Sequence, residues 1–143
     1  MLRHILLAVD GSAASRRAAQ HVRSLLADPE CQVTLLVAIE PPSVLPIAPF
    51  DGFLTTAQSP SPEEVATAQE MIASIRSEFG EARVHTRVAF GPAADTICKV
   101  ADELPADLIV VGARGMNPAE RLLLGSVSDR VVHHANQPVT VVR

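Results

Sequence analysis

The chain has 143 residues, a formal net charge of −4 and a hydrophobic content of 48%. This length suits one domain with one core, and we expect residues 1–143 to form a single domain. The negative charge, the lack of any block of Lys or Arg, and the low aromatic content argue against nucleic acid as a partner. All apolar runs are shorter than the roughly 18 to 20 residues that span a bilayer, so no membrane helix is expected.

The start of the chain and the two cysteines bear on the cellular compartment. The apolar stretch at the start is too short for a signal peptide and has no small-residue cleavage site, so we expect a cytoplasmic protein. Cys31 and Cys98 lie far apart and show no metal-like spacing. We interpret both as reduced, partly buried small apolar residues, with a redox role as the alternative.

A strand, a tight turn, a helix and a second strand are predicted in the first part of the chain. Residues 4–10 form a nearly continuous apolar run with Asp10 at its carboxyl end, and Gly11 and Ser12 follow as a turn. Residues 33–39 are a second apolar run, so the order predicts parallel strands with a right-handed crossover. The apolar face of the helix between them comprises Ala18, Val22, Leu25 and Leu26.

Residues 41–62 contain six prolines among Ser, Thr and Gly, which is typical of a surface loop. Such a loop is either a lid over a ligand or an adaptable excursion. Ser61 and Glu64 then form a capping box with Pro62 at the first helical position, and Gly80 ends the helix. The predicted core face of this helix comprises Val65, Ala68, Ile72, Ile75 and Phe79.

The second half of the chain continues the alternation. Residues 84–89 predict a strand, and the helix that follows ends at Pro105. An apolar strand begins at Asp107, the last helix is expected over residues 127–135, and a short strand follows at Val139–Val142. Five strands with four intervening helices predict an α/β fold, a three-layer, doubly wound parallel sheet with helices on both faces.

A glycine-rich loop follows the strand that begins at Asp107. Two residues separate Gly112 from Gly115, nine separate Gly115 from Gly125, and Ser126 is the predicted N-cap of the last helix. Paired glycines let a backbone approach a ligand, and the N–H groups at a helix start attract a phosphate chain. The alternative is ordinary turn and cap chemistry.

These glycines and the serine resemble the nucleotide-binding signature of the universal stress proteins, in the branch that binds ATP. The resemblance extends to residues 4–12 and 137–143, and therefore spans nearly the whole chain. It implies a Rossmann-like sheet with the strand order 3-2-1-4-5, a homodimer, and a regulatory role for bound ATP in the stress response.

In that order the winding reverses between the first and fourth strands, and open α/β sheets bind ligands at the carboxyl ends flanking such a reversal. Asp10 and Gly112 occupy these two ends. We expect Asp10 to accept hydrogen bonds from the ribose hydroxyls, or else to be only a turn-forming Asx residue before Gly11. By resemblance, Ala38 lies at the adenine edge, with simple strand pairing as the alternative.

The phosphates are the third part of the expected ligand. Gly112 and Gly115 are expected to let the loop approach them, and Arg114 and Arg121 either bind phosphate or are merely solvated. No set of His, Cys and carboxylate residues has metal-ligand spacing, so any Mg²⁺ would arrive with the phosphates. N–H groups and hydroxyls at the helix start are expected from Gly125, Ser126, Val127 and Ser128.

Three classes of function are compatible with this pattern. The first is an ATP-binding regulatory module. The second is a slow ATPase or a phosphotransferase, but the sequence has no GxxxxGK[ST] loop, no GxGxxG fingerprint and no recognisable pair of nucleophile and base. The third is a ligand-free scaffold, which the intact signature disfavours. We therefore expect no catalytic residues and at most weak ATP hydrolysis.

The C-terminal strand Val139–Val142 lies at a sheet edge in the implied order. It is short and apolar, and no charged residue precedes Arg143 in it. Unpaired backbone groups at an edge invite another strand, and a two-fold pairing of this edge with its copy gives a closed dimer. The alternative is an edge protected by its brevity alone.

Overall fold

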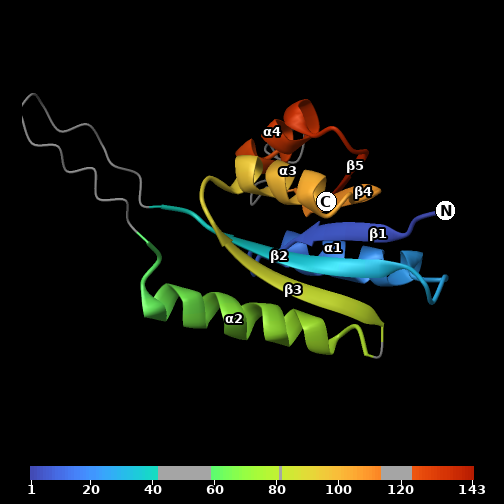
Figure 1. Cartoon of the computed structure of the whole chain (residues 1–143), viewed down its shortest axis with the longest axis horizontal. Helices are drawn as coiled ribbons and strands as arrows, with labels where there is room; N and C mark the ends of the chain where they lie inside the picture. Colours follow the sequence, from blue (N-terminus) through green and yellow to red (C-terminus); the bar gives the residue numbers. More distant parts are fainter. Residues whose placement is uncertain (42–58, 81, 114–123) are drawn as a thin grey trace, which may run out of the picture.

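The computed structural model describes residues 1–41, 59–80, 82–113 and 124–143. Strands and helices alternate along the chain, as the sequence predicts (Figure 1). The strands are β1 (His4–Ala8), β2 (Gln32–Ile39), β3 (Arg83–Phe90), β4 (Leu108–Gly112) and β5 (Val139–Val142). The helices are α1 (Ala13–Leu25), α2 (Pro62–Ser77), α3 (Ala93–Glu103) and α4 (Ser126–His134).

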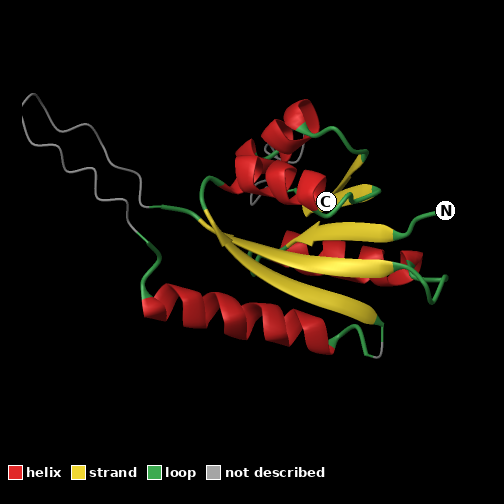
Figure 2. Ribbon diagram, viewed as in Figure 1, coloured by secondary structure: helices red, strands yellow, loops and turns green. Residues whose placement is uncertain are grey.

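The strands form one parallel sheet in the order β3-β2-β1-β4-β5. This order is the one that the resemblance implies. Helices α1 and α2 lie on one face of the sheet, and α3 and α4 lie on the other (Figure 2). The fold is therefore a three-layer, doubly wound Rossmann-like sheet.

Each face of the sheet has its own hydrophobic core. Ile5 and Leu7 of β1 pack toward α1 and α2, whereas Leu6 between them packs toward α3 and α4. Side chains alternate along a strand, so a strand covered on both faces must be apolar at every position. This explains why β1 after His4, and β4 throughout, are continuous apolar runs rather than alternating ones.

The signals at the two ends of α2 are confirmed. Ser61 Oγ accepts a hydrogen bond from the Glu64 N–H at 3.2 Å, and Glu64 Oε2 accepts one from the Ser61 N–H at 2.8 Å. Gly80 follows the helix with a φ of 60°. The predicted core face is buried except at Val65, which lies in the first turn and is only half-buried. Most of the predicted loop before this helix lies outside the described residues.

Strand β1 is shorter than predicted. It ends at Ala8 rather than at Asp10, because Asp10 Oδ1 accepts a hydrogen bond from the Ser12 N–H at 2.9 Å and turns the chain toward α1. Ser12 in turn caps α1, since its Oγ accepts the Ser15 N–H at 3.1 Å. Asp10 therefore lies just beyond the strand, in the turn.

Both cysteines are free thiols, Cys31 buried and Cys98 half-buried. Burial raises the pKa of each thiol, and nearby carboxylates raise it further. The protonated form is the less nucleophilic one, which agrees with their interpretation as small apolar residues. No helix within the described ranges is long and apolar enough to cross a membrane.

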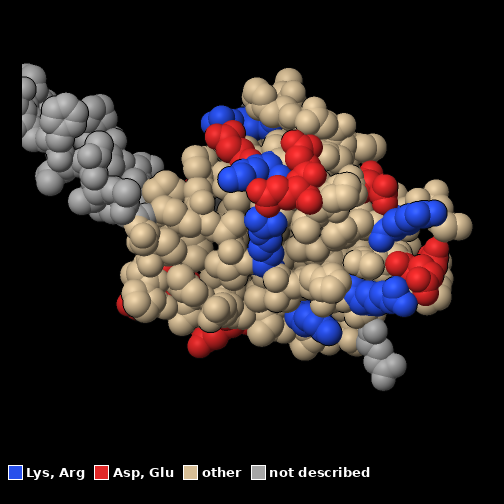
Figure 3. All heavy atoms as spheres, viewed as in Figure 1, with Lys and Arg blue, Asp and Glu red and all other residues tan. Residues whose placement is uncertain are grey.

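Charges of both signs are interspersed on the face shown in Figure 3. Arg87 and Glu103 form an ion pair at 2.6 Å, and Arg130 and Asp95 form another at 3.3 Å. These ion pairs join neighbouring elements, β3 with α3 and α3 with α4.

Candidate functional site

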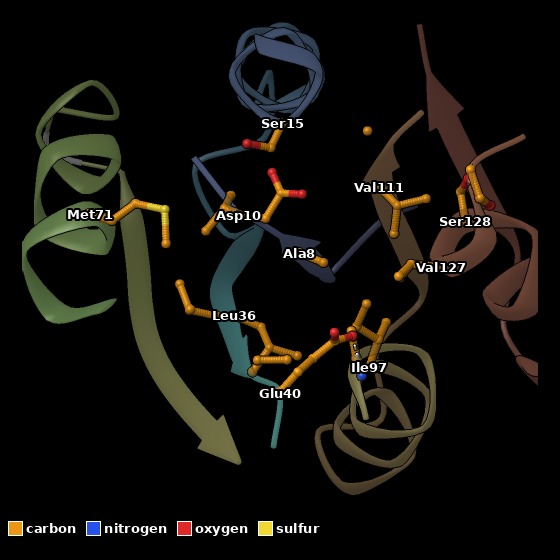
Figure 4. A pocket seen from close by; sticks show the side chains of 16 residues that line it. Ala8, Asp10, Ser15, Leu36, Glu40, Met71, Ile97, Val111, Val127 and Ser128 are labelled. Carbon is orange, nitrogen blue, oxygen red and sulfur yellow. Dashed lines mark hydrogen bonds between the residues drawn. The ribbon is translucent and has the colours of Figure 1, made fainter. Parts of the chain in front are cut away.

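A cavity of about 310 Å³ opens at the carboxyl ends of β1, β2 and β4 (Figure 4). The winding of the sheet reverses at this place, which is the usual ligand position in open α/β sheets. The volume lies at the lower end of the range of about 300–1,000 Å³ that is typical of ligand pockets. The predicted site residues that line the cavity are Asp10, Ala38, Gly112, Gly125, Val127 and Ser128.

Asp10 forms the turn before α1, which the sequence left open as the alternative to ribose binding. Its Oδ1 accepts the Ser12 N–H at 2.9 Å, and Gly11 between them adopts a φ of 79°. The same carboxylate lines the cavity, so turn formation and ligand binding can be performed by one side chain. A Cβ on Gly11 would also lie 2.8 Å from Met71 Sδ, but a flexible methionine side chain can move away from it, so the positive φ is the stronger reason for glycine here.

Gly112 ends β4 against the first turn of α1. A Cβ at this position would lie 2.6 Å from the carbonyl carbon of Ala14 and 2.7 Å from the Ser15 nitrogen. Backbone cannot move aside as a flexible side chain can. Glycine is therefore required here by helix–strand packing, whether or not a phosphate also passes the site.

Helix α4 begins at a different residue from the one predicted to cap it. Gly125, not Ser126, is the N-cap, with φ −61° and ψ 157° and no side-chain cap. The Gly125 carbonyl accepts the first helical hydrogen bond from the Asp129 N–H at 2.9 Å. Ser126 is therefore already helical, and the prediction that it caps the helix was wrong.

The start of α4 nevertheless faces the cavity. Val127 and Ser128 line it, whereas the Ser126 side chain is exposed and does not. The Ser128 hydroxyl donates to the Gly125 carbonyl at 3.0 Å, so its proton is already engaged. The N–H groups of residues 126–128 precede the first intrahelical donor, which makes them the natural anion donors of this helix.

The end of β2 continues past the end of β1. The last register pair of these strands is Ala8 with Leu36, and the Val9 N–H donates to the Leu36 carbonyl at 2.9 Å. Backbone groups alternate sides along a strand, so Ala38 faces the same side as Leu36, whereas the Ile39 carbonyl accepts a hydrogen bond from the β3 side. The Ala38 backbone is thus directed to the side where β1 has ended and the cavity begins.

Several lining residues were not predicted from the sequence, and Glu40 and Met71 are two of them. Glu40 follows β2, and its Oε1 accepts the Ala93 N–H at 3.2 Å at the start of α3. Met71 reaches the cavity from α2. An acid directly after a strand, at the same sheet edge as Asp10, was a usable signal for Glu40. Met71 gave none, because α2 is joined to that edge only by packing.

Gly115, Arg114 and Arg121 lie outside the described residues. Within the part of the chain that is described, no three His, Cys, Asp or Glu residues are grouped so that they could hold a metal ion. His133 and His134 are exposed, and the His133 Nδ1 lies 2.8 Å from the Asp129 carbonyl.

The chain belongs to the universal stress protein family, whose pattern matches residues 1–143. It is 30% identical over 143 residues to a universal stress protein of Methanocaldococcus jannaschii, covering 100% of this chain and 83% of the relative. These matches confirm the family that the sequence resembles.

Solved structures of similar proteins share the fold. One is a universal stress protein in complex with cAMP, with a TM-score of 0.67 and 24% identity, covering 99% of this chain and 97% of that one. Another is a family member from Arabidopsis thaliana with AMP bound, with a TM-score of 0.61 and 19% identity, covering 97% and 90% of the two chains.

Proposed function

We propose that this chain binds one ATP molecule in the cavity and acts as a dimeric regulatory module of the cytoplasmic stress response. The observation that carries the proposal is that three kinds of group meet at one cavity: the carboxylate of Asp10, the strand backbone of Ala38 and the helix start at Val127. Ribose hydroxyls donate to a carboxylate, an adenine edge pairs with backbone groups, and phosphates accept from helix N–H groups. The cAMP and AMP in the two similar structures support an adenine nucleotide.

In the proposed complex, adenine lies against Ala38, the ribose against Asp10, and the phosphates run past Gly112 to the start of α4. Ser126 contributes its backbone N–H, because its side chain is exposed. Gly115 is assigned to the phosphates from its place in the signature alone. Any Mg²⁺ would be held by phosphate oxygens and water, which is the usual way in which this ion accompanies a nucleotide.

The first alternative is a slow ATPase or phosphotransferase that uses the same cavity. Phosphoryl transfer needs a positioned nucleophile and neutralisation of the phosphate charge. Among the described lining residues, Asp10 is the carboxylate assigned to the ribose, and its Oδ1 accepts the Ser12 N–H. The sequence shows no recognisable pair of nucleophile and base, so binding rather than turnover is the proposed activity.

The second alternative is a ligand-free scaffold. A scaffold does not require a carboxylate, a free stretch of strand backbone and a helix start to meet at one cavity of about 310 Å³. This favours a ligand over an empty structural role.

The test is to purify the protein gently, denature it by heat, and identify any released nucleotide by mass spectrometry. We expect adenine nucleotide, and calorimetry on nucleotide-free protein should give one ATP per chain. A protein that releases no nucleotide and gives no binding heat with ATP would exclude the proposed function.

A further inference from the structure

Glu40 is the second carboxylate of the cavity, and neither ribose nor phosphate binding accounts for it. In Figure 4 its side chain and that of Asp10 lie on opposite sides of Ala8. Its Oε1 accepts the Ala93 N–H at 3.2 Å, at the start of a helix whose N-cap, Pro92, makes no side-chain cap. One role of Glu40 is therefore to cap α3 from the end of β2.

Capping uses only part of the hydrogen-bonding capacity of this carboxylate. An ionised carboxylate has two oxygens with about four acceptor positions, and the Ala93 N–H occupies one of them. Glu40 directly follows the end of β2, two residues beyond Ala38, and both residues line the cavity. The remaining acceptor positions thus lie next to the backbone that the proposed nucleotide site assigns to the base.

We propose that Glu40 selects the base, by accepting a hydrogen bond from the exocyclic amino group of adenine and repelling the 6-oxo group of hypoxanthine or guanine. This inference rests on the proposed nucleotide site and adds the side chain that makes it specific. The Ala38 backbone offers one donor and one acceptor, and a base with the opposite edge can still pair with both if it shifts in the plane of its ring. An ionised carboxylate offers acceptors only, and therefore distinguishes the two.

The expected discrimination follows from the strength of one charge-assisted hydrogen bond. Such a bond corresponds to roughly ten-fold or more in affinity, and the exposure of Glu40 keeps the effect toward the lower end. We expect the wild-type protein to bind ATP about ten-fold more tightly than inosine triphosphate. Purine riboside triphosphate, which has only hydrogen at position 6, should lie between them.

The decisive variant is Glu40→Gln. Its amide oxygen can still accept the Ala93 N–H, while its amino group can donate to a 6-oxo group. The preference for ATP over inosine triphosphate should therefore disappear or reverse, with α3 still capped. Glu70→Gln is the matched control, because Glu70 is exposed on α2, does not line the cavity, and loses the same charge. Calorimetry with both nucleotides gives the ratios, and thermal denaturation checks the fold.

The role of Glu40 would be overturned if Glu40→Gln kept the wild-type ratio of affinities for ATP and inosine triphosphate, or if the wild type bound the two nucleotides equally well. In either case, ATP binding by the wild type would still support the proposed function. A wild type that binds neither nucleotide would overturn both proposals. If Glu40→Gln does not fold, Glu40→Asp makes the same test, because the shorter side chain keeps the charge but withdraws its oxygens from the base. A wild-type ratio in that variant would again exclude base selection by Glu40.

Discussion

Gly112 and Ala14 are in direct backbone contact. A Cβ on Gly112 would lie 2.6 Å from the carbonyl carbon of Ala14, so the end of β4 and the first turn of α1 meet without any side chain between them. The first glycine of the signature is therefore needed to pack the sheet against a helix. Its presence in the sequence does not by itself distinguish a nucleotide-binding member from a scaffold.

The variant Gly112→Ala tests this contact. We expect it to lower the free energy of unfolding by roughly 1–3 kcal/mol, because the helix or the strand must shift to admit the methyl group. Urea denaturation measures the change. Gly80→Asn is the control, since nothing lies within 4 Å of a Cβ there and Asn tolerates a positive φ. Equal stability of Gly112→Ala and the wild type would contradict the contact.

Asp10 can be tested for ligand binding separately from turn formation. Asp10→Asn keeps an oxygen for the Ser12 N–H but loses the charge, so stability should change little, while ATP affinity falls about ten-fold or more. Asp10→Ala should lose affinity and also about 1 kcal/mol of stability with the turn hydrogen bond. Calorimetry and urea denaturation separate the two effects. Wild-type ATP affinity in both variants would leave Asp10 as a turn residue only.

Catalysis should be slow or absent, because the two carboxylates among the described lining residues, Asp10 and Glu40, are assigned to the ribose and the adenine base rather than to the phosphates. With saturating ATP and Mg²⁺ we expect turnover well below the range of about 1 to 1000 per second that is typical of enzymes. Phosphate release by freshly purified protein measures it, with Asp10→Ala as the blank for a contaminating ATPase. Turnover within the enzymatic range that is lost in this variant would identify an enzyme.

His4 should make stability depend on pH. Burial lowers the pKa of His4, and the nearby His85 lowers it further. A hydrogen bond to the Leu104 backbone and the charge of Asp107 act in the opposite direction, but the net effect is a lowered pKa. Between that lowered pKa and the ordinary value of 6.5, the unfolded chain binds the proton more readily than the folded one. Stability should therefore fall as the pH drops through this window.

The variant His4→Gln tests that dependence. Glutamine can still bond with Thr34, whose Oγ1 lies 2.8 Å from the His4 Nε2, but it does not titrate. Urea denaturation at several pH values below 7 should show a shallower loss of stability than in the wild type. Parallel curves for the two proteins would assign the pH dependence to other groups.

The proposed dimer uses the outer edge of β5. The Pro138 and Val142 carbonyls accept hydrogen bonds from residue 109 and residue 113, so residues 138, 140 and 142 face β4 and Val141 faces outward. Val141→Pro should abolish the dimer, because it removes an outward N–H while sparing the β4 ladder. Light scattering at tens of micromolar measures the assembly.

Thr140→Pro is the comparison for that experiment. Its N–H faces β4, so this variant should lose stability through the sheet itself. If Val141→Pro remains dimeric with a stable fold, the β5 edge is not the interface. A monomeric wild type under the same conditions would contradict the dimer altogether.

The sequence by itself determined the order of elements and the fold class, because the signals for both are local. Continuous apolar runs predict strands buried on two faces, and the Ser61–Glu64 capping box and Gly80 mark the ends of α2 within a few residues of chain. The predicted cap of α4 failed by one residue, since glycine and serine are both acceptable N-caps and only the backbone geometry distinguishes them.

Only the tertiary structure decided which distant residues meet. Gly112 is confined by Ala14, and Glu40 caps α3 at Ala93, in each case across a large separation in sequence. Neither contact leaves a periodic or short-range pattern in the chain, because each depends on how closely two packed elements approach. The residues expected to contact a ligand could thus be predicted from the sequence. The structural roles of residues at the site, such as the close packing at Gly112 and the capping of α3 by Glu40, followed only from the packing of helices on the sheet.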